Sequence, residues 1–119
     1  MSNQTICSSK KISPEQAIKF VKSGHRVVVG HACGEPACLV EELIKQKNRL
    51  NDVEIVHMVA IGQCSYCQSG MEKHFRHNSL FAGHGSRQAI HEGRADYTPV
   101  FFSEVPRLFK NGILLHMAE

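Results

Sequence analysis

Apolar residues occur in short runs along the chain, separated by polar segments that contain glycine or proline. Residues 27–29 are three valines with no polar alternation, which is typical of a strand covered by helices on both faces. Residues 53–61 and 97–102 form similar runs, and residues 79–82 are a shorter candidate strand. Strands that alternate with helix-length segments predict an α/β domain, with a mostly parallel sheet and helices on both faces.

The first helix is predicted from its N-terminal cap. Ser13 and Gln16 have the spacing of a capping box, and Pro14 suits the first helical position. Gly24 is placed to end this helix. The helix has an apolar stripe that we expect to be buried, made of Ala17, Ile18, Phe20 and Val21.

Three further helices are expected after the first strand. Pro36 can begin the second helix, whose apolar residues lie on one side: Leu39, Val40, Leu43 and Ile44. Residues 86–92 predict the third helix, and Ser103 caps a last helix that Gly112 ends. Residues 113–119 begin another apolar run and stop before a full strand is complete.

Length and composition favour a single globular domain. The net charge of +3 arises from 14 basic and 11 acidic residues scattered along the chain, so we expect no nucleic-acid surface. No apolar stretch approaches the roughly 20 residues of a membrane span, and the polar start has no signal-peptide core. The five cysteines without a secretion signal favour reduced thiols and a cytoplasmic location. We expect a polar tail over residues 1–11 and the domain over residues 12–119.

The turn after the first strand is a candidate ligand site. In an open parallel sheet, ligands bind beyond the carboxyl ends of the strands, where residues 30–36 emerge. His31 directly follows the strand, and Gly30 and Gly34 permit close approach of the backbone. The spacing is G-x-x-x-G, so neither the dinucleotide fingerprint nor the P-loop is present. A plain turn, in which the glycines only allow tight packing, stays an alternative.

Four of the cysteines could form a metal or redox site. Cys64 and Cys67 are a C-x-x-C pair, and Cys33 with Cys38 would complete a four-thiolate zinc site. The spacing of Cys33 and Cys38 fits such a site poorly, and the C-x-x-C pair lies in a glycine-bounded loop instead of at a helix start. We therefore expect these thiols to have neither role, and we expect no bound metal.

The remaining polar clusters contain no recognisable catalytic arrangement. The metal motif H-E-x-x-H does not occur, since His91 and Glu92 are followed by Gly93 and Arg94. Residues 92–99, EGRADYTP, are interpreted as a helix end followed by a salt-bridged turn. From these residues the chain is an α/β domain with one ligand edge. The alternative is a non-catalytic domain that binds a thiol cofactor, a metal or a partner chain.

Three stretches of the sequence resemble a known family. They are GHACGEPACLV at 30–40, FRHNSLFAG at 75–83 and EGRADYTPVFFSEVPRLF at 92–109. The chain resembles the N-terminal part of the acetyl-CoA hydrolase/transferase family, and most closely the 4-hydroxybutyrate CoA-transferases. The resemblance runs from about residue 12 to residue 112. It implies the CoA-transferase (NagB/RpiA-like) fold, in which two similar α/β halves face each other, and it implies that the C-terminal half is absent from these 119 residues.

The resemblance also implies an activity and a set of residues. The intact protein would transfer CoA between acyl-CoA and a short-chain carboxylate through a glutamyl-CoA intermediate. The nucleophilic glutamate belongs to the C-terminal half, so this chain holds no catalytic residue and should be inactive alone. Coenzyme A is a substrate, no metal is required, and the intact protein should form homo-oligomers. The residues expected to bind substrate are Gly30, His31, Gly34, Glu35, Pro36, Gly62, Ser103 and Glu104.

Overall fold

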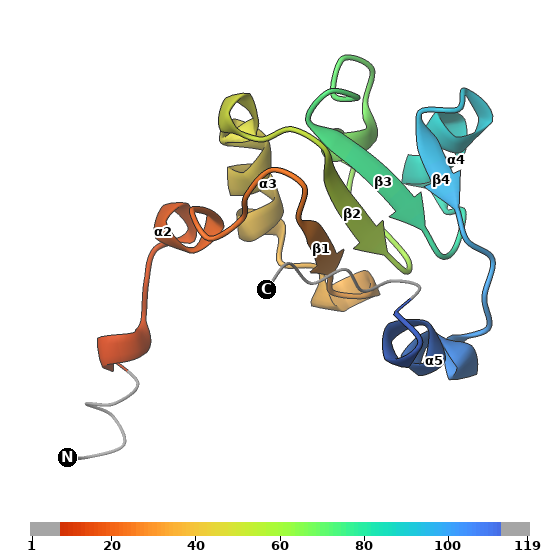
Figure 1. Cartoon of the computed structure of the whole chain (residues 1–119), viewed down its shortest axis with the longest axis horizontal. Helices are drawn as coiled ribbons and strands as arrows, with labels where there is room; N and C mark the ends of the chain where they lie inside the picture. The colour runs from red at the N-terminus through yellow and green to blue at the C-terminus, as the bar shows by residue number, and fades with distance from the viewer. Residues whose placement is uncertain (1–7, 113–119) are drawn as a thin grey trace.

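The computed structural model describes residues 8–112. Its sheet has four strands in the order β1-β2-β3-β4, and every neighbouring pair is parallel (Figure 1). The strands are β1 (Arg26–Val29), β2 (Val53–His57), β3 (Phe75–Ser79) and β4 (Ala95–Tyr97). The helices are α2 (Pro14–Ile18), α3 (Ala37–Lys45), α4 (His84–His91) and α5 (Val105–Lys110). Short 3₁₀ helices are η1 (Ala32–Gly34), η2 (Lys47–Arg49), η3 (Ser65–Cys67) and η4 (Phe102–Glu104). The α/β class and the parallel sheet are therefore confirmed.

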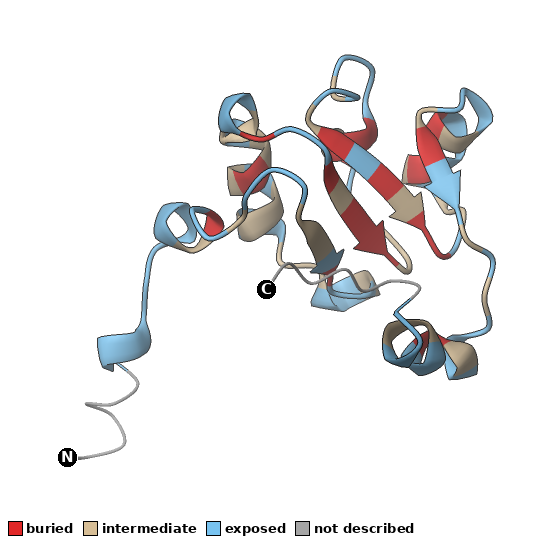
Figure 2. Ribbon diagram, viewed as in Figure 1, coloured by how far each residue is buried: buried red, intermediate tan, exposed pale blue. Residues whose placement is uncertain are grey.

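The two faces of the sheet are covered unequally. Helices α2, α3 and α4 cover one face, where Ile18, Leu43 and Ala89 join the main core. Helix α5 lies on the other face and packs Val105 against Val56 of β2. Figure 2 shows that buried residues concentrate in β2 and β3, the two central strands. Helices thus lie on both faces, as predicted, but among residues 8–112 the second face is covered only near α5.

The prediction that β1 is covered on both faces is wrong. Val28 is 52% exposed, because within the described residues β1 is an edge strand and α5 leaves this part of the sheet open. The same face of the sheet also carries polar side chains. Glu54 pairs with Arg26 and accepts a hydrogen bond from Asn78, whose own side-chain oxygen accepts one from Thr98. The valine run alone could not indicate this, because coverage depends on residues far along the chain.

Strand β3 lies earlier in the sequence than predicted. Residues 79–82 do not form it, and only Ser79 belongs to the strand. The strand is polar on one face and buried on the other, since Phe75 and His77 lie in the core while Arg76 binds Asp96 of β4 at 2.5 and 2.8 Å. A search for continuous apolar runs therefore missed it.

Strands β2 and β4 are shorter than their apolar runs at 53–61 and 97–102. The N–H of Thr98 still donates to the carbonyl of Ser79, at 2.9 Å. Pro99 has no N–H with which to extend the ladder, so β4 ends here and the predicted strand over 97–102 is wrong. Strand β2 ends at His57, where the chain bends into the loop that precedes η3.

Helix α2 has the predicted start and an earlier end. The Ser13 side chain accepts a hydrogen bond from the Gln16 N–H and the Gln16 side chain accepts one from Ser13, which confirms the capping box. The helix ends at Ile18, not at Gly24. Phe20 is 74% exposed, so the predicted buried stripe is wrong at this position. The chain leaves the helix through tight turns in which the Phe20 N–H donates to Ala17.

The other three helices form where predicted, with one incorrect cap. Helix α3 begins after Pro36 and buries Leu43, and α4 covers nearly all of the predicted range. Ser103 does not cap α5, because it lies within η4 and Glu104 occupies the cap position. Gly112 follows α5 with φ at 70°. The apolar run at 113–119 lies outside the described residues. Within 8–112, no helix has the length and apolar content that crossing a membrane requires.

Candidate functional site

The turn after β1 is stabilised by backbone hydrogen bonds within the turn and by one to the segment after β2. The Gly34 N–H donates to the His31 carbonyl at 2.8 Å, and the Ala32 N–H donates to the Val59 carbonyl at 3.0 Å. A Cβ on Gly30 would lie 2.3 Å from the carbonyl oxygen of Gly34, so this position requires glycine. A Cβ on Gly34 would meet no atom within 4 Å. Gly30 therefore serves tight packing, whereas the backbone at Gly34 is open to approach.

His31 stands at the carboxyl end of β1 with an exposed side chain. Its ring meets the ring of Phe102 edge-on, with centroids 5.3 Å apart. Phe102 belongs to η4, so this contact joins the first turn to the segment before α5. The imidazole is thus positioned by an aromatic neighbour while its nitrogens remain available as hydrogen-bonding groups.

Glu35 links the two turns at this edge of the sheet. Its carboxylate accepts a hydrogen bond from the Gly62 N–H at 3.2 Å. A Cβ on Gly62 would lie 2.6 Å from the other carboxylate oxygen, so the glycine allows the close contact. Pro36, the next residue, occupies the cap position of α3. Glu35, Pro36 and Gly62 are therefore brought together, as expected for a shared site.

A buried histidine of β2 contacts the backbone of the turn after β1. His57 Nε2 lies 2.9 Å from the Gly30 carbonyl oxygen, and its Nδ1 lies 2.9 Å from the Tyr66 hydroxyl. A carbonyl only accepts, so Nε2 carries the proton and Nδ1 accepts from Tyr66. Burial is the main cause that lowers the pKa of His57, which keeps the ring neutral. Sequence reasoning missed this residue, because a single histidine at the end of an apolar strand belongs to no motif.

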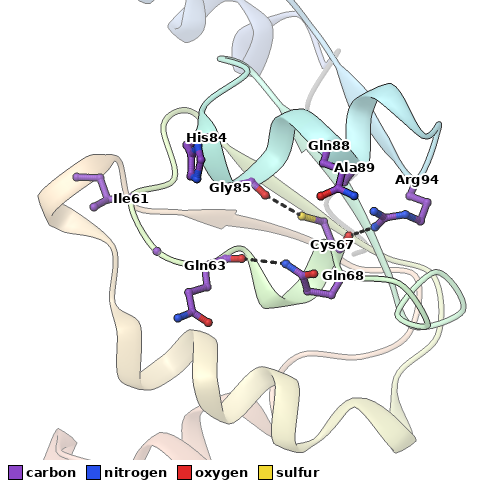
Figure 3. A pocket seen from close by; sticks show the side chains of 10 residues that line it. Ile61, Gln63, Cys67, Gln68, His84, Gly85, Gln88, Ala89 and Arg94 are labelled. Atoms are coloured by element: carbon purple, nitrogen blue, oxygen red, sulfur yellow. Dashed lines mark hydrogen bonds between the residues drawn. The ribbon is translucent and has the colours of Figure 1, made fainter.

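Two hollows flank the loop that follows β2. One, of about 450 Å³, lies between this loop and α4, and its lining includes Gly62, Cys67, His84 and Arg94 (Figure 3). The other, of about 360 Å³, includes Glu35 and Cys64 and again Gly62. Gly62 thus contributes to both. A ligand of moderate size could approach the Glu35–Gly62 contact from either side.

Ser103 and Glu104 do not join this contact directly. Both belong to η4, Ser103 is exposed, and the Glu104 carboxylate accepts a hydrogen bond from Arg107 at 3.0 Å. Their connection to the first turn is the ring contact between His31 and Phe102. The structure thus places six predicted residues, from Gly30 to Pro36 and Gly62, in one group, with Ser103 and Glu104 beside it.

The four described cysteines do not assemble as one site. Cys33 and Cys38 are exposed, whereas Cys64 and Cys67 are buried. Within the part of the chain that the structure describes, no three His, Cys, Asp or Glu side chains converge as metal ligands would. These four cysteines therefore do not lie together in the structure as the ligands of a four-thiolate zinc centre do.

Known proteins with similar sequences are CoA transferases. The chain is 50% identical over 107 residues to the 4-hydroxybutyrate coenzyme A transferase of Clostridium kluyveri, covering 90% of this chain and 25% of that protein. It is 40% identical over 99 residues to a succinyl-CoA:acetate/propanoyl-CoA:succinate CoA transferase of Fasciola hepatica, covering 81% of this chain and 20% of that protein. The chain thus spans a quarter or less of the length of these relatives.

Solved structures show the same fold. RipA from Yersinia pestis aligns with 97% of this chain and 29% of its own length, with a TM-score of 0.84 and 21% identity. The 4-hydroxybutyrate CoA-transferase from Porphyromonas gingivalis aligns with 94% of this chain and 24% of its own length, with a TM-score of 0.67 and 23% identity. The family model of the acetyl-CoA hydrolase/transferase N-terminal domain matches residues 1–117. The chain therefore belongs to the acetyl-CoA hydrolase/transferase family.

Proposed function

We propose that this chain is the N-terminal part of a CoA-transferase. The enzyme would move CoA between an acyl-CoA, such as acetyl-CoA or butyryl-CoA, and a short-chain carboxylate such as 4-hydroxybutyrate. The observation that carries the proposal is the 50% identity over 107 residues to a 4-hydroxybutyrate coenzyme A transferase. The names of the relatives specify different carboxylate substrates, so the choice of 4-hydroxybutyrate rests on the identity to that one relative.

The proposed reaction is covalent and passes through a glutamate of the C-terminal half. Its carboxylate attacks the thioester carbonyl, the C–S bond breaks, and an acyl-glutamyl anhydride forms as CoA thiolate leaves. The thiolate then attacks the glutamyl carbonyl, releasing the first carboxylate and leaving a glutamyl-CoA thioester. The acceptor carboxylate repeats these two steps in reverse order and departs as the new acyl-CoA. None of the residues 8–112 is assigned the nucleophilic role.

The described residues would form one wall of the substrate cleft. His31 would donate a hydrogen bond to an acyl or carboxylate oxygen, supported by its exposure and by the ring contact with Phe102. The open backbone at Gly34 would allow close approach of the substrate. Glu35 is engaged by the Gly62 N–H, which favours a positioning role over attack on the thioester. Ser103 and Glu104 would border the cleft on the η4 side.

A complementation experiment tests whether the nucleophile lies in the C-terminal half and this chain supplies only a wall of the cleft. The purified chain should transfer no CoA between acetyl-CoA and 4-hydroxybutyrate, because binding groups without a nucleophile offer no anhydride route. Adding the separately produced C-terminal remainder of the Clostridium kluyveri relative should restore transfer, measured as formation of 4-hydroxybutyryl-CoA by chromatography. Robust transfer by the chain alone would contradict the placement of the nucleophile. A mixture that forms a complex and stays inactive would contradict the cleft assignment.

A further inference from the structure

Cys64 and Cys67 lie together beneath the loop that follows β2, and both are buried. We propose that this pair is a redox-active dithiol that hydrogen peroxide converts reversibly into a Cys64–Cys67 disulfide. The expectation that these thiols have no role, drawn from their place in a glycine-bounded loop, is thereby revised. The proposal is independent of the proposed CoA transfer, because it concerns only the chemistry of these two sulfurs.

The backbone turn between the two cysteines brings their Cα atoms into the range that a disulfide spans. The Cys67 N–H donates to the Cys64 carbonyl at 2.9 Å, which closes a four-residue turn. A turn of this kind brings its first and last Cα atoms within about 7 Å, and disulfides span about 4.4–6.8 Å between Cα atoms. The Cys67 Sγ lies 3.1 Å from the Cys64 carbonyl oxygen, so the sulfur lies against the backbone of its partner residue. Closing the bond requires side-chain rotation and little backbone movement.

The two thiols are chemically unequal, which suits sequential oxidation. A hydrogen bond from the Cys67 thiol is the main cause that lowers the pKa of Cys64 to about 7. The same hydrogen bond is the main cause that raises the pKa of Cys67. Cys64 is therefore the thiolate that reacts first, and Cys67 is the thiol that resolves the product. The Tyr66 hydroxyl, 3.6 Å from Cys64 Sγ, adds a polar neighbour to the attacking sulfur.

The reaction with peroxide balances as two displacements. The Cys64 thiolate attacks one peroxide oxygen, the O–O bond breaks, and the product is a sulfenic acid, while the leaving hydroxide takes up the thiol proton as water. The Cys67 sulfur then attacks the Cys64 sulfur, the S–O bond breaks, and a second water forms with the Cys67 proton. The dithiol loses two electrons and two protons, and peroxide takes up both and is reduced to two waters.

Access to the sulfurs favours a small oxidant. The residues Cys64 and Cys67 are 3% and 5% exposed, so bulky disulfides meet a barrier. Each lines a hollow, of about 360 Å³ at Cys64 and about 450 Å³ at Cys67, large enough for peroxide. Figure 3 shows Cys67 between its loop and α4, with its sulfur directed at the Gly85 carbonyl, 3.8 Å away. Arg94 donates to the Cys67 carbonyl and holds this turn against the β4 side.

The test uses the full chain with Cys7, Cys33 and Cys38 replaced by serine, so that only the pair remains. After peroxide treatment we expect both free thiols to disappear on thiol titration under denaturing conditions. Intact mass should fall by two hydrogen atoms, and dithiothreitol should restore both thiols. With Cys67→Ser added, Cys64 should instead gain one oxygen atom, which dimedone traps as the sulfenic acid.

Two results with the serine variant would overturn the proposal. One is that both thiols survive a peroxide dose that oxidises the exposed Cys33 in the unmodified chain. The other is direct gain of two or three oxygen atoms with no disulfide formed. If the serine variants fail to fold, differential alkylation and peptide mapping of the unmodified chain answer the same question. A linkage between residues 64 and 67 is expected, and linkage of either to Cys33 or Cys38 alone would refute the assignment.

Discussion

Replacing Gly30 by alanine should disrupt the first turn, because the new Cβ meets backbone that has no freedom to move. The Cβ would lie 2.3 Å from the Gly34 carbonyl oxygen, whereas ordinary contacts begin at 3.4 Å. Relief requires a shift of the turn. The hydrogen bonds that hold that turn include His57 Nε2 to the Gly30 carbonyl at 2.9 Å and the Gly34 N–H to the His31 carbonyl at 2.8 Å.

The expected loss of stability can be estimated from these contacts. Overpacking of a tight site costs about 1–3 kcal/mol, and weakening a hydrogen bond costs about 1 kcal/mol. Replacing glycine also stabilises the folded state by about 0.4–1 kcal/mol, through the lower entropy of the unfolded chain. We therefore expect Gly30→Ala to lower the free energy of unfolding by about 1–3.5 kcal/mol. Urea denaturation followed by far-UV circular dichroism measures this value.

Gly34→Ala is the matched control in the same turn. A Cβ there meets nothing within 4 Å and the backbone φ is not in the left-handed region, so stability should change by no more than about 0.5–1 kcal/mol. The reasoning is refuted if Gly30→Ala unfolds within about 0.5 kcal/mol of the unmodified chain. Equal destabilisation by both substitutions would also refute it, because the turn would then be sensitive to any side chain.

Two further predictions concern side chains around the same edge of the sheet. Glu35→Ala should lower the free energy of unfolding by about 1 kcal/mol, because the Gly62 N–H loses its acceptor. Glu41→Ala, on the exposed side of α3, should leave the free energy of unfolding nearly unchanged in the same urea assay. Equal effects of the two substitutions would contradict the link between the turns. His77 has no exposed surface, and burial lowers its pKa from 6.5 to about 4. Between pH 6.5 and pH 4 the unfolded chain therefore binds a proton at this residue that the folded chain does not bind. The free energy of unfolding should fall by up to roughly 3 kcal/mol as the pH drops from 6.5 toward 4. In His77→Phe this acid-side loss should be smaller, as measured by unfolding at several pH values, and an unchanged pH profile would contradict it.

Periodicity and turn chemistry predicted most of the architecture. The capping box at Ser13 and the start of α3 after Pro36 are local features, and local sequence determines them. The errors arise where long-range contacts decide. Strand β3 is polar on one face because Arg76 and Asn78 find partners on neighbouring strands, which no local pattern shows. The exposure of Val28 depends on where α5 comes to lie.

The candidate site was predictable where its residues follow a strand in sequence. His31 and Gly34 could be predicted as site residues, because ligands are expected at the carboxyl edge of a parallel sheet. The contact of Glu35 with Gly62 joins residues 27 positions apart and needed the structure. The support from His57 and Tyr66 was missed because a lone histidine in an apolar strand has no motif to mark it.

The most direct test of the proposed cleft wall is a chimera. Residues 12–112 of this chain would replace the corresponding segment of the 4-hydroxybutyrate coenzyme A transferase of Clostridium kluyveri, which supplies the C-terminal half. Steady-state kinetics would follow CoA transfer from acetyl-CoA to 4-hydroxybutyrate. The chimera should be active, and His31→Ala should lower kcat/KM roughly ten- to a hundredfold, as expected for about 1.5–3 kcal/mol from one hydrogen bond to a charged oxygen. His91→Ala, on the exposed end of α4, should leave kcat/KM unchanged. A folded chimera whose kinetics are indifferent to His31→Ala would contradict the account.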